Sequence, residues 1–354
     1  MDTSRRKTIK QLSTGLAATG LFGLSATTFS ACAGDAKKTA EKMAKTVTAP
    51  KEPFFKISLA QWSLHNSFFG DFLKSGDFGA FGRALMTDPD SVLQGELNPI
   101  DFPAIAKKEY GVDAVEFVNT FYFNKAKNME YLKDLKGRCN GEGVQPVLIM
   151  CDALGDLGDL DDAKRKAAVE NHYQWVEAAK FLGCHAIRVN AAGKGTAEEV
   201  RAAAVNGLGS LTEFGKANGI NIIVENHGGY SSNGAWLASV MKQVDNPFCG
   251  TLPDFGNFCI TRDAKDYRKC IEEYDRYKGM AELMPYAKGI SAKAHDFDEN
   301  GNEVNTDFKR MLQIAKDAGY TGYVDIEYEG TNLSEPDGIR ATKALLERVG
   351  KELA

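Results

Sequence analysis

Short apolar runs rich in β-branched residues alternate with longer amphipathic segments from Lys56 to the end of the chain. The runs have the length of buried strands, and the longer segments repeat their apolar positions at the helical period. The strand-like runs lie near 56–62, 112–118, 144–150, 184–190, 220–226, 248–254, 288–294 and 321–327, and the clearest helical patterns cover 161–182, 196–218, 262–283, 305–318 and 334–352. Eight strands alternating with helices predict an α/β fold, a single (β/α)8 TIM barrel with a parallel sheet. An open doubly wound sheet is the alternative, although no Gly-x-Gly-x-x-Gly follows an early strand.

The segment from Asn66 to Asn98 interrupts this alternation with glycines and five phenylalanines. A loop of this length is usually functional or mobile. We interpret it as an irregular loop that covers the substrate; the alternative is an aromatic flap packed on the side of the barrel.

The first residues have the features of an export signal. Arg5 and Arg6 lie in a basic cluster, a mild apolar run extends from Leu12 to Phe29, and small residues precede Cys32. This order resembles a twin-arginine signal and also a bacterial lipoprotein signal, in which the cysteine is lipidated. The alternative is an amphipathic tail with a chance arginine pair.

We therefore expect a signal peptide over 1–31, a solvated tether over 32–53 and the barrel over 54–354. The protein would then be periplasmic or in the cell envelope, with contact to a membrane only through a lipid anchor at Cys32. Composition is that of an ordinary globular protein, with 26% charged residues and a net charge of −5. The signal carries +3, so its removal leaves −8, which disfavours nucleic acid as a partner.

The chain has seven cysteines and no Cys-x-x-Cys pair, so a zinc–thiolate site is unsupported. Cys151, Cys184 and Cys249 lie in or beside apolar runs and are interpreted as small buried hydrophobic residues.

Three acids end apolar runs that are far apart in sequence: Glu225, Asp254 and Glu327. The carboxyl ends of barrel strands meet at one mouth, where catalytic residues lie. Three carboxylates there can converge on one hard divalent cation. Each acid alone could instead cap a helix or form a salt bridge.

From Lys56 onward the chain resembles the xylose isomerase-like barrel superfamily of sugar phosphate isomerases and epimerases. The resemblance rests on Val224-Glu225-Asn226-His227, Asp254-Phe255-Gly256-Asn257 and Ile326-Glu327-Tyr328-Glu329. It implies metal ligands at the ends of strands five, six and eight, and a histidine ligand on strand seven.

The strand-seven ligand departs from the family pattern. Ser291 occupies the usual histidine position, and Lys293 keeps the place of the family's lysine. Residues 291, 293 and 295 face one side of an extended strand. We expect His295 to be the fourth ligand; the alternatives are Ser291 or water, with His295 bonded to Asp296 or Asp298.

Polar and aromatic residues follow other predicted strands and could bind a polyol. The candidate substrate-binding residues are Trp62, His65, Glu116, Arg188, Asn190, His227 and Asn257, and Gln61 and Asn119 lie beside them. Each could be structural instead; Arg188, for example, could pair with Glu225 or Glu116.

These residues predict chemistry on a small sugar substrate with a divalent ion such as Mn, Mg, Co or Zn. Such an ion acidifies a C–H bond beside a carbonyl and stabilises an enediolate. In the epimerases that the chain resembles, the residues matching Glu225 and Glu327 exchange the proton, and Lys293 could stabilise the oxyanion.

The leading expectation is a metal-dependent isomerase or epimerase acting on an unphosphorylated sugar or keto-sugar. A lyase or dehydratase of the same fold, eliminating from a keto-glycoside or an inosose, is the second. A non-catalytic, surface-anchored carbohydrate-binding barrel is the third. The sequence leaves the sugar, the ion and the oligomeric state open.

Overall fold

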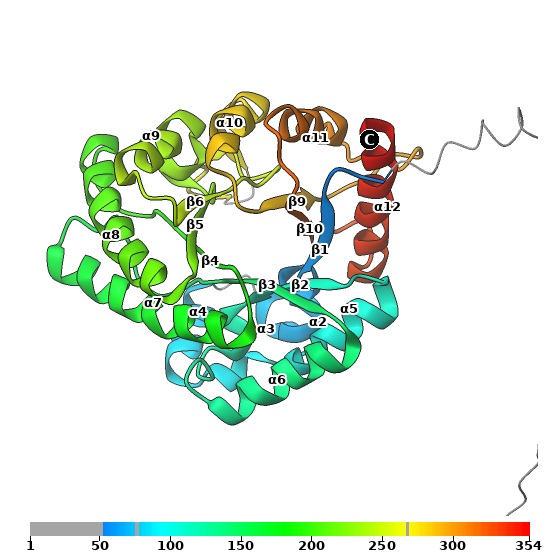
Figure 1. The fold of residues 1–354 in the computed structure, drawn as a ribbon, viewed down its shortest axis with the longest axis horizontal. Helices are drawn as coiled ribbons and strands as arrows, with labels where there is room; N and C mark the ends of the chain where they lie inside the picture. The colour runs from blue at the N-terminus through cyan, green and yellow to red at the C-terminus, as the bar shows by residue number, and fades with distance from the viewer. Residues whose placement is uncertain (1–51, 75–77, 267–268) are drawn as a thin grey trace, which may run out of the picture. The chain divides into compact units, whose positions relative to one another are not determined.

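All eight apolar runs form strands of one parallel sheet, as the pattern predicts (Figure 1). The computed structural model of the chain describes residues 52–74, 78–266 and 269–354. In that range the barrel strands are β1 (Lys56–Ala60), β2 (Ala114–Val118), β3 (Gln145–Met150), β4 (Ala186–Val189), β5 (Asn221–Glu225), β6 (Cys249–Leu252), β9 (Ile290–Ala294) and β10 (Tyr323–Tyr328).

The sheet curls until its two edge strands meet. Its order is β6-β5-β4-β3-β2-β1-β10-β9, and every neighbouring pair is parallel. Between the edge strands β6 and β9, parallel bridges join Thr251 to Ala287 and Asp254 to Ser291. These bridges close the barrel, so the (β/α)8 prediction is confirmed and the open doubly wound sheet is excluded.

A ring of helices surrounds the strands (Figure 1). Its main members are α5 (Phe102–Tyr110), α6 (Met129–Glu142), α7 (Asp162–Leu182), α8 (Ala197–Asn218), α9 (Gly234–Val244), α10 (Arg276–Leu283), α11 (Phe308–Asp317) and α12 (Glu335–Leu353). The start of α8 is fixed by a capping box in which Thr196 and Glu199 bond each other's backbone N–H groups. Helix α7 ends at Gly183, whose φ of 93° favours glycine.

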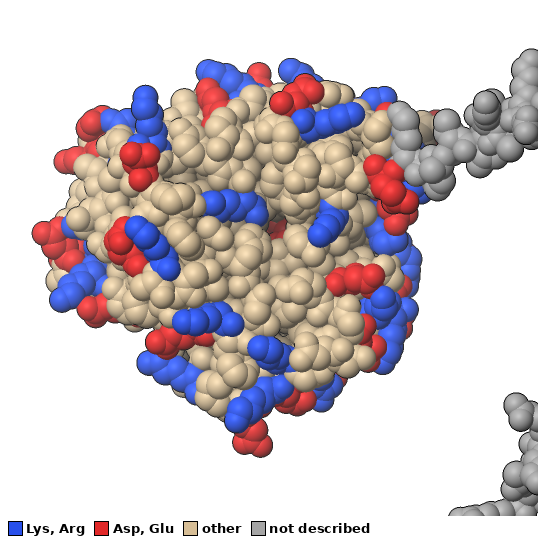
Figure 2. Space-filling model, in the orientation of Figure 1, with Lys and Arg blue, Asp and Glu red and all other residues tan. Residues whose placement is uncertain are grey.

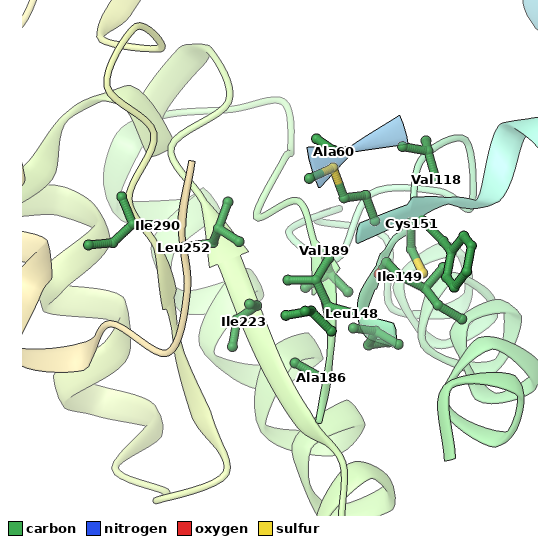
Figure 3. Close-up of a cluster of buried hydrophobic side chains, with 14 of the residues drawn as sticks. Ala60, Val118, Leu148, Ile149, Cys151, Ala186, Val189, Ile223, Leu252 and Ile290 are labelled. Atoms are coloured by element: carbon green, nitrogen blue, oxygen red, sulfur yellow. Dashed lines mark hydrogen bonds between the residues drawn. The ribbon is translucent and has the colours of Figure 1, made fainter. Parts of the chain in front are cut away.

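The barrel strands are apolar on both faces, because one face packs on the helices and the other fills the interior. Figure 3 shows Leu148, Ala186, Ile223 and Leu252 among the buried side chains of neighbouring strands. Ile223 faces the same side as Glu225, two residues further along β5. Each fully buried aliphatic side chain of this kind stabilises the fold by about 1.5–3 kcal/mol. The polar mouth therefore lies next to a well-packed apolar barrel interior.

The segment between β1 and α5 is helical, and the prediction of an irregular loop there is wrong. It contains α2 (His65–Phe69), α3 (Asp71–Lys74) and α4 (Phe78–Thr87). Phe68 and Phe69 are fully buried and contact Phe121 with ring centroids 4.9 and 4.6 Å apart. This packing agrees with the alternative of an aromatic flap on the barrel.

The predicted helical segment 262–283 is a helix only at its end. Strands β7 (Cys259–Arg262) and β8 (Cys270–Glu273) form an antiparallel hairpin before α10. A disulfide joins Cys259 to Cys270. The sequence pattern does not reveal this pair, because cysteines 11 residues apart show their pairing only once the hairpin brings them together.

The predicted signal peptide, with Arg5, Arg6 and Cys32, lies outside the described residues, as does nearly all of the tether. Within the described ranges, none of the helices combines the length and apolar character needed to cross a bilayer.

Candidate active site at the barrel mouth

Three acids from different strands meet at the carboxyl end of the barrel. Glu225 is the last residue of β5, Asp254 follows β6 by two residues, and Glu327 lies in β10. One carboxylate oxygen of each lies within 4.8 Å of the others, and all three side chains are buried. Acidic atoms are visible in the hollow at the centre of the face shown in Figure 2. The structure thus brings together the three acids that the sequence singled out.

Polar neighbours fix the orientation of the two glutamates. Asn257 Nδ2 donates a hydrogen bond of 2.9 Å to Glu225 Oε1. Ser291 Oγ donates one of 2.6 Å to Glu327 Oε2. Each glutamate therefore has one oxygen held by a neutral polar side chain, and its other oxygen lies near a buried cation.

Asp254 is held in the same way by backbone groups. The N–H groups of Gly256 and Asn257 both donate to Asp254 Oδ1 at 2.7 Å. Among the described residues, the buried oxygens Asp254 Oδ2 and Glu225 Oε2 have no hydrogen-bond donor. Buried acceptors without a donor are costly, and a bound cation would satisfy them.

Lys293 is a buried cation beside this group. Its Nζ lies 3.0 Å from Glu329 Oε1, 3.5 Å from Glu327 Oε1 and 3.7 Å from Asp254 Oδ2. Burial alone would lower the pKa of Lys293, but Glu327, Glu329 and Asp254 raise it well above its usual range. Burial raises the pKa of Glu327 and Asp254, with Lys293 opposing the increase. Lys293 is therefore charged, and its ammonium group lies between the carboxylates of Glu327, Glu329 and Asp254.

Arg188 on β4 connects Glu225, Asp254 and Glu327, which we call the acid group, to a further carboxylate. Its Nε forms an ion pair of 2.8 Å with Glu225 Oε2, and its Nη1 donates to Asp152 Oδ1 at 2.7 Å. Asn190 Nδ2 also donates to Asp152, at 2.8 Å. Burial alone would raise the pKa of Asp152, but Arg188 and His227 lower it to about 2. The alternative in which Arg188 pairs with Glu225 is thus present, whereas its role in substrate binding stays a prediction.

The donor set fits a divalent ion. It offers three buried carboxylates: within the described chain, Asp254 Oδ2 has no hydrogen-bond donor, and Glu225 Oε2 has no hydrogen-bond donor but an ion pair with Arg188. Carboxylate oxygens suit Mg, Mn and Zn. The three acids are the residues that would hold the ion.

His295 does not join this group in the described part of the chain. It is partly buried just after β9, and its backbone N–H donates to Glu303 Oε1 at 3.4 Å. Ser291, in the usual histidine position, is bonded to Glu327 instead. A ligand role for His295 therefore stays a prediction from the sequence.

Trp62 and His65 form an aromatic wall of the mouth. Their rings stack with centroids 5.1 Å apart, and His65 Nδ1 is hydrogen-bonded to the carbonyl of Trp62 at 2.8 Å. Burial alone would raise the pKa of Glu329, but Lys293 and His65 lower it to about 2. His65 and Lys293 thus flank one carboxylate at the mouth.

Other predicted substrate-binding residues are internal. Glu116 is completely buried and accepts a hydrogen bond of 2.7 Å from Ser58 Oγ. Gln61 accepts from the backbone N–H of Val118, and Asn119 donates to the backbone carbonyl of Asp152. These contacts lie within the protein, so they agree with the alternative that each of these residues is structural.

Sequence reasoning missed three acids. Asp152 follows the apolar run of β3, so the strand-end rule that found Glu225 could have found it. Glu329 lies two residues after Glu327, on the same side of an extended chain. Asp325 is buried in the interior beside Glu116, and it lies two residues before Glu327, so the same alternation could have found it.

The xylose isomerase-like TIM barrel family model matches residues 105–349. A C-glycoside deglycosidase alpha subunit from Arthrobacter globiformis is 38% identical over 65 residues, which cover only 18% of this chain and 18% of that protein.

Solved structures share the whole fold at low identity. A 3-keto-D-glucoside 4-epimerase from E. coli matches with a TM-score of 0.59 and 14% identity over 83% of this chain and 99% of that chain. The IOLI protein, solved with a zinc atom, also matches with a TM-score of 0.59 and 14% identity, over 84% of this chain and 99% of that one. With its barrel, its mouth acids and a family match over most of its length, the chain belongs to the xylose isomerase-like TIM barrel family.

Proposed function

We propose that the protein is a metal-dependent isomerase or epimerase that moves a proton beside the carbonyl of an unphosphorylated sugar or keto-sugar. The observation that carries this proposal is the convergence of Glu225, Asp254 and Glu327, whose carboxylate oxygens lie within 4.8 Å. When bound there, a divalent ion supplies Lewis acidity toward a carbonyl oxygen.

Glu225 and Glu327 are the proton carriers in this proposal. Both are held by a hydrogen bond at one oxygen, from Asn257 and Ser291 respectively. The raised pKa of Glu327, caused first by burial, brings it closer to the range in which a carboxylate exchanges protons near neutral pH. Lys293, charged and within 4 Å of Glu327 and Asp254, is placed to stabilise an oxyanion.

The electrostatics support an unphosphorylated substrate. Lys293 and Arg188, the two buried cations of the mouth, are already paired with carboxylates. A phosphate would have to compete with these carboxylates for both side chains. Neutral hydroxyl groups can bind beside them without such competition.

Elimination from a keto-glycoside is the second candidate. The similarity to a C-glycoside deglycosidase alpha subunit favours it, although only over a short stretch. The same proton abstraction would begin both reactions, and the fate of the neighbouring bond would separate them.

Deuterium exchange tests the proposal. The protein is incubated with 3-keto-glucose in D2O with Mn, Mg or Zn, and NMR follows the loss of protons beside the carbonyl. We expect exchange with the native protein, none with Glu327→Gln, and native exchange with Glu177→Gln, an exposed control on α7. Exchange by Glu327→Gln at the native rate would refute the mechanism, and ion binding without exchange by any variant would favour the non-catalytic carbohydrate-binding barrel.

We also propose that the protein is exported through the signal in residues 1–31 and anchored at Cys32. The disulfide between Cys259 and Cys270 supports an oxidising compartment. Replacing Arg5 and Arg6 with lysine should block export, and Cys32→Ser should release the protein from membranes. Unchanged fractionation of these variants would refute the proposal.

A further inference from the structure

A cavity of about 450 Å³ opens beside the acids, at the ends of β4 and β5 and next to the β7–β8 hairpin. Its lining includes Gly193, His227, Gly228, Tyr230, Ile260 and Thr261. Small-molecule sites usually have volumes of about 300–1,000 Å³. The carboxyl ends of barrel strands share one edge, so this cavity and the acid group belong to the same mouth.

The loop that forms its floor is held in place. The backbone N–H groups of His227 and Gly228 donate to the hydroxyl oxygens of Ser231 and Ser232, both at 2.9 Å. Ser232 Oγ in turn donates to the backbone carbonyl of Asn257 at 2.7 Å. Asn257 also orients Glu225. The cavity is therefore preformed and tied to the acid group.

Its lining combines an aromatic ring and an aliphatic side chain with polar backbone and side-chain groups. Tyr230 uses its hydroxyl to donate to the carbonyl of Gly195 at 2.8 Å and stacks on Trp236 with centroids 5.8 Å apart. Tyr230 lines the cavity together with the aliphatic side chain of Ile260 and the backbone of three glycines. No acid, lysine or arginine is among the described residues that line it. The cavity therefore differs from the acid group, in which charged side chains predominate.

We propose that this cavity is a subsite for the non-sugar group of a glycoside, and that the preferred group is a planar aromatic one. The inference rests on the proposed function, which places the sugar ring at Glu225, Asp254 and Glu327. His227 lines the cavity and lies two residues after Glu225, so it stands between the two halves of such a ligand. Its imidazole can hydrogen-bond the atom that links them. The preferred substrate in this proposal is thus a glycoside, which fills the cavity that a free sugar leaves empty.

Calorimetric titration with unreactive probes tests the subsite. Phenyl β-D-glucoside and methyl β-D-glucoside share the sugar and differ only in the group that would enter the cavity. We expect the phenyl compound to bind the zinc-loaded or manganese-loaded protein at least about tenfold more tightly, which equals about 1.4 kcal/mol. Ile260→Asp should abolish this preference because it places a charge on the apolar wall.

A matched control lies in the same hairpin. Ile271 in β8 is 61% exposed and is not among the residues that line the cavity, so Ile271→Asp should keep the preference for the phenyl compound. Equal affinity for both glucosides, or a preference that survives Ile260→Asp, would overturn the subsite. Tighter binding of a disaccharide than of the phenyl glucoside would overturn the aromatic assignment.

The deuterium-exchange assay separates failure of the subsite from failure of the function. Exchange on 3-keto-glucose without any phenyl preference would overturn only the subsite. An absence of exchange on every keto-sugar, together with an absence of glucoside binding, would overturn both proposals.

Discussion

Replacing Glu116 by glutamine should stabilise the protein at alkaline pH and change its stability little at acidic pH. Glu116 is completely buried, and burial raises its pKa from 4.5 to about 7 against the opposing hydrogen bond from Ser58. Between these two values the native state binds a proton that the unfolded state has lost, so the free energy of unfolding falls as pH rises. One unit of pKa corresponds to about 1.4 kcal/mol. The native protein should therefore lose up to about 3 kcal/mol between pH 4.5 and pH 8.

Glutamine removes this loss of stability without creating a cavity. Its amide oxygen can accept the hydrogen bond from Ser58, and its NH2 can donate toward Asp325, whose buried oxygens have no donor within the described residues. Burial, followed by the charge of Glu116, raises the pKa of Asp325 well above its usual range. A neutral donor in place of Glu116 therefore removes a negative charge beside the Asp325 carboxyl group.

Urea denaturation, followed by circular dichroism in the presence of a chelator, measures the effect. At pH 8 the variant should be more stable than the native protein by up to about 3 kcal/mol, whereas at pH 4.5 the two should be similar. Glu177→Gln, at an exposed position on α7, should change stability little at either pH. A difference between Glu116→Gln and native protein that is the same at both pH values would refute the reasoning.

Three further predictions follow from single contacts. Ser291 orients Glu327, whereas His295 lies outside the acid group in the described part of the chain. Ser291→Ala should therefore lower the zinc or manganese content, measured by mass spectrometry, more than His295→Ala does. The reverse order would support His295 as a ligand. Replacing Cys259 and Cys270 with serine removes the link across the β7–β8 hairpin, so limited proteolysis should cut the hairpin faster than in the native protein; equal rates would contradict this. Gly338→Ala would place a Cβ 2.3 Å from ring carbons of the buried Tyr328, so urea denaturation should show a loss of at least about 1–3 kcal/mol; an unchanged midpoint would contradict the packing.

The sequence alone determined the architecture and the three mouth acids. Element type is encoded locally, because a buried parallel strand needs a short apolar run and an outer helix needs an amphipathic repeat. The same local logic located Glu225, Asp254 and Glu327, since each ends or follows such a run and barrel strands share one mouth. It needed no knowledge of contacts between distant residues.

Only the tertiary structure decided which polar side chains face the acids. Lys293 and Arg188 reach them, Glu116 turns into the interior with Ser58, and His295 remains outside the group. These outcomes depend on how far each strand extends past its neighbours and on side-chain contacts across the barrel. The sequence pattern likewise did not reveal the disulfide or the helices before α5. Both depend on contacts between distant residues, namely the pairing of the hairpin strands and the packing of Phe68 and Phe69 on Phe121. Local periodicity specifies which element forms, whereas the closure of the barrel specifies which side chains meet.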